Sequence, residues 1–455
     1  MRDAVIVAAV RTAVGKRNGA LSGVHPVDLS AHVLQALAER SGTDPAVVDD
    51  VIWGCVSQFG EQTFDIARNA VLAAGWPLSV PGVTVDRQCG SSQQSVHFAA
   101  AGLVSGQYDV VVAGGVESMS RVPMGSSRGT ANPSGSGLET LFKGVPPNQG
   151  IGAEMIAERW GLSRTQLDEY SLASHQKAAA AIDEGRFAGQ ITPVKLDDGT
   201  VMDTDEGVRR GSTLEKLAQL KPAFKPDGVI HAGNSSQISD GAAALMMTTS
   251  DKARELGLTP VARVHTAVLA ADDPVIMLTA PIPATQKALR KSGLRPDEIG
   301  AFEVNEAFAP VPLAWLAEIG ADPKALNPNG GAIALGHPLG GSGARIMTTL
   351  IHHMRDNGIR YGLQTMCEGG GQANATILEL LYPGPTPARP PPPHRASRRP
   401  RLAPRPPAFH PCPRSTSAET IACSSSDNSK KRLVACRPGK IVRDAARFPW
   451  RYPAR

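Results

Sequence analysis

The sequence predicts an α/β protein whose body consists of two similar halves. Short runs rich in β-branched residues alternate with helical stretches, a pattern typical of α/β units on a mostly parallel sheet. Two distant segments also share one plan, in which an extended stretch, a tight turn, a helix, a strand and glycines follow one another. With 455 residues the chain exceeds one ordinary domain and can bury a large core.

The individual elements follow from local periodicity and from start and stop signals. Strand candidates include residues 4–9, 50–56, 84–88, 109–115, 244–249, 301–306 and 362–368. Helix candidates include residues 25–40, 90–106, 163–185, 281–293, 308–320 and 341–357. In the third of these helices, Ser163 is the expected N-cap and Gly185 the expected C-terminal stop.

The repeated plan divides the chain into parts. Residues 1–118 form the expected first half and residues 259–382 the second. Residues 119–240 are rich in Gly, Pro, Ser and polar helix, which indicates an inserted loop subdomain, and the chain is expected to return to the first half at 241–258. Residues 383–455 are rich in Pro and Arg, so we expect a disordered tail.

The charge of the chain is divided in the same way. The tail holds sixteen Lys and Arg against three Asp and Glu, and its net charge of +13 within the overall +5 leaves −8 for residues 1–382. Such a basic tail could bind nucleic acid, but it lacks interleaved aromatic residues, so we do not expect a nucleic-acid partner. No apolar run reaches the roughly 18 residues of a membrane span, and the N-terminus is not typical of a signal peptide. We therefore expect a cytoplasmic protein without a membrane partner.

Cysteine is rare in the body, which contains only Cys55, Cys89 and Cys367. No two of these form a CxxC pair, so the sequence supports neither a metal site nor a dithiol redox site. In "TVDRQCGSSQQ", Cys89 lies just before a predicted helix. Unpaired N–H groups and the positive end of the helix dipole favour the thiolate there, although a free cysteine is more often a small buried apolar residue.

Three further motifs carry residues capable of chemistry. In "GHPLGGSGAR", glycines flank His337, which could serve as a base on a thiol. A dinucleotide-binding loop is excluded there because Ile346 stands where that motif needs its last glycine. In "FEVNEAFAP", Asn305 and Glu306 follow a strand and are site residues or a helix cap. In "CEGGG", Cys367 precedes glycines whose N–H groups could stabilise an oxyanion.

Taken together, these motifs make residues 1–382 resemble the thiolases, the acetyl-CoA acyltransferases. The resemblance rests on "RTAVGK", "QCGSS", "AGGVESMS", "AGNSSQISDGAAA", "NEAFA", "GGAIALGHPLGGSGAR" and "CEGGG" in that order. It implies a duplicated fold of α/β/α/β/α layers and a homodimer or homotetramer. It also implies that acyl-CoA and CoA are substrates and that no separate cofactor is needed.

The resemblance also assigns roles to single residues. Cys89 matches the nucleophile that becomes acylated, His337 the base that activates it, and Cys367 the acid/base that moves a proton on the acetyl-CoA methyl carbon or on the incoming thiol. Asn305, through a water, and His337 match one oxyanion hole, and the N–H groups of Cys89 and Gly369 match the other. Positions that contact CoA or line its channel are Arg209, Ser236 and Phe308.

One departure from the pattern bears on the substrate. Acetoacetyl-specific biosynthetic thiolases carry "HMG" where this chain has "PNQGIGAE", with Asn148 and Gln149. We therefore expect thiolytic cleavage of longer or bulkier 3-ketoacyl-CoAs, as in actinobacterial fatty-acid or steroid side-chain β-oxidation, with Gln149 at the substrate. The alternatives are an acetyl-CoA C-acetyltransferase that makes acetoacetyl-CoA, a ketoacyl-synthase-type condensing enzyme, and a protein that binds nucleic acid through its tail.

Overall fold

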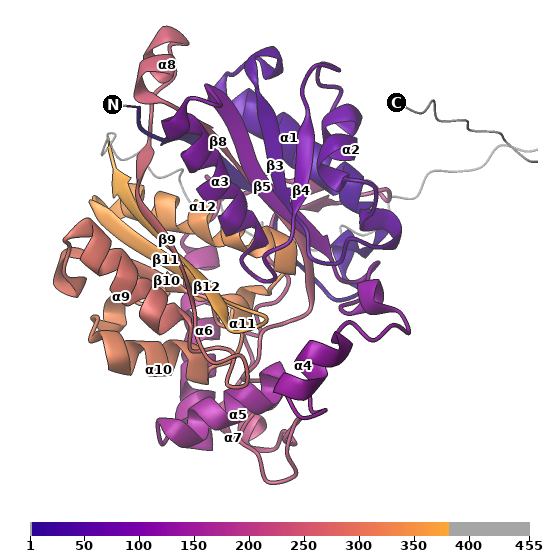
Figure 1. The fold of residues 1–455 in the computed structure, drawn as a ribbon, viewed down its shortest axis with the longest axis vertical. Helices are drawn as coiled ribbons and strands as arrows, with labels where there is room; N and C mark the ends of the chain where they lie inside the picture. Colours follow the sequence, from indigo (N-terminus) through magenta and orange to yellow (C-terminus); the bar gives the residue numbers. More distant parts are fainter. Residues whose placement is uncertain (1, 382–455) are drawn as a thin grey trace, which may run out of the picture. The chain divides into compact units, whose positions relative to one another are not determined.

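The structure, a computed structural model, describes residues 2–381 (Figure 1). The predicted tail at 383–455 lies outside the described residues. Within them, one large sheet has the strand order β10-β11-β12-β9-β1-β8-β5-β3-β4, and β2 pairs with β8. The strands are β1 (Val5–Arg11), β2 (Gly15–Lys16), β3 (Asp50–Gly54), β4 (Gly82–Val85), β5 (Val110–Ser118), β8 (Ser239–Thr248), β9 (Ala262–Ala271), β10 (Ala301–Val304), β11 (Tyr361–Glu368) and β12 (Gln372–Leu380).

The sheet repeats one topology twice, which confirms the predicted duplication. In the first half β3 is parallel to β5, which is antiparallel to β8, which is antiparallel to β1. In the second half β10, β11, β12 and β9 pair in the same way. The edge strand β4 of the first half pairs parallel with β3. In the second half its place is taken by a single parallel bridge between Phe302 and Leu326. The halves join where β1 pairs with β9 at Val5–Arg263 and Ile6–Ala262.

The expectation of a mostly parallel sheet is wrong. In the large sheet of the described residues, the β3–β4, β3–β5 and β10–β11 pairs are parallel, and the remaining six pairs are antiparallel. The reason is that β8 returns from the inserted segment antiparallel to both β5 and β1, and that no crossover helix separates β12 from β11. β12 returns directly from β11 through a glycine turn in which Gly370 and Gly371 have positive φ angles.

Helices cover both faces of each half and give the five layers expected (Figure 1). α1 (Pro26–Ser41) and α2 (Ile66–Ala73) pack on one face of the first half, and α9 (Pro281–Ser292) and α10 (Pro310–Ile319) pack on the second. Between the halves lie α3 (Ser91–Ser105) and α12 (Leu339–Asn357). Successive side chains of a strand therefore face different helix layers. In β5, for example, Val112 faces α1 and α2 whereas Val111 faces α3 and α12.

The segment between β5 and β8 contains most of the remaining elements. These are α4 (Gly135–Leu141), α5 (Gln149–Arg159), α6 (Arg164–Asp183), β6 (Val194–Lys195), β7 (Val201–Met202) and α7 (Leu214–Ala218); α8 (Ser250–Glu255) and α11 (Ala332–Leu335) lie further along. The predicted N-cap of α6 is confirmed, because Ser163 and Gln166 form a capping box. The domain boundaries proposed from the sequence stay a prediction.

The two central helices begin side by side, and this contact positions the functional residues. A Cβ at Gly343 of α12 would overlap the backbone nitrogen of Gln93 in α3, so only glycine permits this approach. The Ala344 N–H also donates to the Ser92 hydroxyl at 2.9 Å. As a result, the turns that precede the two helices, with Cys89 and His337, come together.

Candidate active site

A cavity opens at the N-terminal ends of α3 and α12. Cys89 and His337 line it, and so do three of the predicted substrate-contact residues, Gln149, Ser236 and Phe308. The loops that carry the last two pair with each other, since Ser236 N–H donates to the Ala307 carbonyl at 2.9 Å. The rest of the lining consists of Met119, Met124, Phe224, Ser235, Gln237, Ile238, Ala307 and Leu339.

Cys89 is held on a strained turn between β4 and α3. Gln88, the residue before it, has φ +49°, a left-handed conformation that non-glycine residues seldom adopt. The Cys89 side chain is buried among Met119, Leu339, Ile346 and Met366. Burial raises its pKa well above the ordinary value, and the nearby Cys367 and Glu368 raise it further. The expectation that the helix start makes Cys89 a thiolate at rest is therefore wrong, because desolvation outweighs the helix dipole.

The hydrogen bonds of His337 define which of its nitrogens is the base. The Ser342 hydroxyl donates its one hydrogen to the Pro338 carbonyl at 2.8 Å and lies 2.6 Å from His337 Nδ1. Ser342 must then accept from Nδ1–H, which leaves the lone pair on Nε2. Burial, with a smaller effect of Arg345, lowers the pKa of His337 to about 3, so the imidazole is neutral. A neutral base thus lines the same cavity as a neutral thiol.

Asn305 links His337 to the second cysteine. It follows β10 directly, and its N–H donates to the Thr365 carbonyl of β11 at 3.1 Å, which fixes it beside Cys367. Its amide Nδ2 lies 3.5 Å from His337 Nε2 and 3.8 Å from Cys367 Sγ. Burial raises the pKa of Cys367 to about 12, against the smaller lowering effect of the Asn305 amide, so this thiol carries its proton.

Gly369 follows Cys367 by two residues at the β11–β12 turn. A Cβ on Gly369 would lie 2.9 Å from Gln88 Oε1, so the glycine turn approaches the turn that carries Cys89. Within residues 2–381, the Gly369 N–H has no backbone acceptor, and the Cys89 N–H lies against its own thiol. Two N–H groups close to the nucleophile fit the predicted oxyanion hole, and this role stays a prediction.

The structure does not bring Arg209 to this cavity. Its side chain is exposed in the loop before α7, and its backbone N–H donates to His175 Nδ1 at 3.1 Å. A role for Arg209 could therefore only concern a part of CoA that extends outside the cavity, and it stays a prediction.

Sequence reasoning missed two kinds of residue at the site. Ser342 lies in the first turn of α12, five residues after His337. Its position in the same glycine-rich motif could have indicated that it contacts His337. Met124 and Phe224 line the cavity although 62% and 39% of their surface is exposed. The Phe224 ring lies where a side chain at position 150 would be, which only Gly150 permits. No local sequence pattern predicts a contact between residues this far apart in the chain.

The described residues contain neither a metal-binding cluster nor a membrane-spanning helix. Within residues 2–381, no group of three or more His, Cys, Asp and Glu side chains is placed to hold a metal ion. In that same range, no helix has both the length and the apolar character needed to cross a membrane.

Comparison with known proteins gives consistent matches over the described part of the chain. Residues 4–251 match the family model described as "Thiolase, N-terminal domain", and residues 258–380 match "Thiolase, C-terminal domain". The chain is 51% identical over 389 residues to the steroid 3-ketoacyl-CoA thiolase FadA6 of Mycobacterium tuberculosis, covering 84% of this chain and 95% of that protein. It is also 45% identical to a 3-ketoacyl-CoA thiolase of Pseudoalteromonas translucida and 44% identical to one of Aliivibrio fischeri, with 84% and 83% of this chain and all of each relative covered.

Proposed function

The chain belongs to the thiolase family, and we propose that it cleaves 3-ketoacyl-CoAs with CoA in β-oxidation, releasing acetyl-CoA and a shortened acyl-CoA. The observation that carries the residue assignment is the position of Asn305, whose amide lies between His337 Nε2 and Cys367 Sγ. A nucleophile with its base, an oxyanion donor and a second thiol then converge on one cavity. We propose that CoA enters as a substrate and that no separate cofactor takes part.

In the first step, Cys89 attacks the 3-keto carbon while His337 Nε2 takes its proton. The tetrahedral intermediate collapses with cleavage of the bond between carbons 2 and 3, which leaves an acyl-cysteine and the enolate of acetyl-CoA. Protonated Nε2 and Asn305 stabilise the enolate oxygen. Cys367, a neutral thiol because of its burial, donates the proton that converts the enolate carbon into the methyl group.

In the second step, the Cys367 thiolate takes the proton of the incoming CoA thiol. The CoA sulfur attacks the acyl-cysteine carbonyl, and the N–H groups of Cys89 and Gly369 hold the oxyanion. Collapse releases the shortened acyl-CoA, and the Cys89 sulfur recovers its proton from His337. Both cysteines and the imidazole end in the states in which they began.

We propose bulky acyl chains as the physiological substrates. The cavity wall is largely apolar, and the partly exposed side chains of Met124 and Phe224 extend this apolar surface to the solvent. Gln149 also lines the cavity, whereas the neighbouring Asn148 caps α5 by accepting from Gly150 N–H at 2.9 Å. The FadA6 relative, whose name specifies a steroid substrate, supports the same proposal.

A thiolysis panel on the purified full chain tests this proposal. We expect kcat/KM to rise from acetoacetyl-CoA to long-chain and steroid-sized 3-ketoacyl-CoAs. Met124→Lys should lower kcat/KM for bulky substrates more than for acetoacetyl-CoA, whereas Leu138→Lys, at an exposed residue of α4 that does not line the cavity, should not. A preference for acetoacetyl-CoA would favour the acetyltransferase alternative.

We also propose a cytoplasmic homodimer that pairs through β4. This strand ends the sheet, and Val83 on it is 43% exposed. Phe64, 89% exposed, lies next to Asp65, whose carboxylate accepts from the Thr84 hydroxyl at 2.6 Å. An edge strand bordered by exposed apolar residues is a typical surface for a second copy. Light scattering should give a dimer for the wild type and a monomer for Val83→Arg; a tetramer would show that a further surface takes part.

A further inference from the structure

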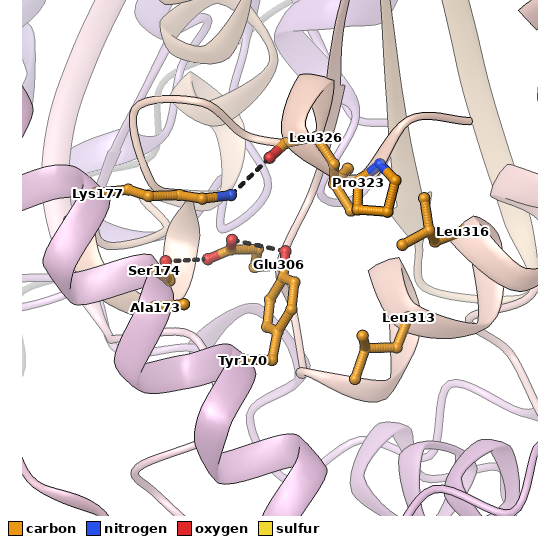
Figure 2. Close-up of a pocket in the computed structure, with 9 residues that line it drawn as sticks. All are labelled: Tyr170, Ala173, Ser174, Lys177, Glu306, Leu313, Leu316, Pro323 and Leu326. Atoms are coloured by element: carbon orange, nitrogen blue, oxygen red, sulfur yellow. Dashed lines mark hydrogen bonds between the residues drawn. The ribbon is translucent and has the colours of Figure 1, made fainter. Parts of the chain in front are cut away.

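Glu306 lies beside Asn305, but its side chain belongs to a different network (Figure 2). Glu306 is 1% exposed, and its carboxylate faces α6. Oε1 accepts from Tyr170 Oη at 2.9 Å and from Asn327 Nδ2 at 3.0 Å. Oε2 accepts from Ser174 Oγ at 2.7 Å and from the backbone N–H of Ile333 at 3.1 Å. Four donors from three separate parts of the chain therefore converge on one buried carboxylate.

Two of these donors lie on segments connected to the reacting groups, and the other two lie on α6. Tyr170 and Ser174 belong to α6 in the insertion. Ile333 belongs to α11, which ends two residues before His337. Asn327 also accepts from Val304 N–H through Oδ1 at 2.9 Å and so holds the end of β10, from which Asn305 extends.

The packing around the carboxylate leaves little freedom to this arrangement. A Cβ on Gly331 would lie 2.6 Å from both Glu306 oxygens, so α11 approaches the carboxylate as closely as a backbone can. The Gly331 N–H donates to Ser174 Oγ at 3.1 Å, which ties the same turn to α6 a second time. A shift of Glu306 would therefore move the turn that leads into His337.

We propose that Glu306 is a positioning residue that sets the distance between Asn305 and His337, on which the proposed thiolase chemistry rests. Asn305 and His337 come from different segments, and Glu306 is adjacent to the first and bonded to the lead-in of the second. A buried carboxylate accepts charge-assisted hydrogen bonds, which are shorter and stronger than neutral ones. A displacement of about 1 Å at reacting groups can cost about 10²-fold in rate.

Glu306→Gln tests this proposal, because it keeps the shape and turns one acceptor into a donor. The new NH2 group must face either Asn327 Nδ2 or the Ile333 N–H, and both are donors. We express kcat per molecule whose Cys89 can be acetylated by acetyl-CoA. This kcat should fall at least about fivefold below that of the control variant, while KM for CoA should stay within about twofold of the wild-type value. Glu154→Gln is the matched control, since Glu154 is also buried and accepts from Val229 and Ile230 N–H groups at 2.9 and 3.0 Å.

A loss of kcat smaller than fivefold would overturn the proposal. A variant with a lower Tm but an unchanged kcat per acylated site would overturn it as well. Should Glu306→Gln fail to fold, the pair Tyr170→Phe with Ser174→Ala removes two of the four donors and keeps the carboxylate. That pair should show the same selective loss of kcat, and unchanged kcat would again overturn the proposal. A wild type without thiolysis would refute the proposed function itself, whereas an active wild type with an unaffected variant refutes this inference alone.

Discussion

Ser342→Ala should slow thiolysis without removing any group that touches the substrate. The Ser342 hydroxyl, 2.6 Å from His337 Nδ1, is the acceptor that keeps the proton on that nitrogen and the lone pair on Nε2. Alanine leaves a buried Nδ1–H without a partner, which costs about 1–3 kcal/mol. The ring can avoid that cost only by moving its proton to Nε2, where it can no longer accept one from Cys89. Either way the productive state is less populated by that amount.

At about 1.4 kcal/mol for each tenfold in rate, kcat/KM should fall about 5- to 150-fold. The assay is thiolysis of a 3-ketoacyl-CoA, followed by the loss of substrate absorbance at fixed CoA. Ser171→Ala is the matched control, because Ser171 is equally buried and donates to the carbonyl four residues earlier at 2.7 Å. A Ser342→Ala enzyme within twofold of the Ser171→Ala enzyme would refute the assignment of the His337 tautomer.

Three further predictions concern the proton transfers and the tail. Cys367→Ala should slow exchange of the acetyl-CoA methyl protons with deuterated solvent by about 10²–10⁴-fold while Cys89 is still acetylated; wild-type exchange in the variant would point to another base. Burial lowers the pKa of His337 to about 3, so the base stays neutral as the pH falls through about 6.5, and kcat/KM should show no acid limb there; an acid limb at pH 6–7 that depends on His337 would contradict this. Removal of residues 383–455 should leave Tm, turnover and nucleic-acid retention nearly unchanged, because we expect a Pro/Arg-rich composition to contribute little packing; a large loss of any of these would show a functional tail.

Much of the fold is encoded locally and could be predicted. The strands around Val5 and Val110 are continuous apolar runs because helices cover both of their faces. β9 and β12 were not predicted, each for a different reason. β9 mixes Arg263 and His265 into a strand with an intermediate burial pattern, and β12 begins within a glycine turn. Both are antiparallel additions, so missing them also produced the wrong prediction of a mostly parallel sheet.

The residues of the site were predictable by type, whereas their electrostatic state was not. Glycine-rich motifs and strand ends indicated Cys89, His337, Asn305 and Cys367, and the fold brings the last three within hydrogen-bond range. The pKa of each thiol depends on burial by partners distant in sequence, such as Met366 beside Cys89. The helix dipole is a local signal and desolvation is not, so the sequence indicated the smaller effect.

The most direct test of the account is the mass of the peptide that contains Cys89 after the full chain is incubated with acetyl-CoA. We expect one added acetyl group on that peptide, its loss on addition of CoA, and no adduct in Cys89→Ala. A stable acetyl group on another residue, or an unchanged adduct in the Cys89→Ala chain, would contradict the claim that this thiolase works through Cys89.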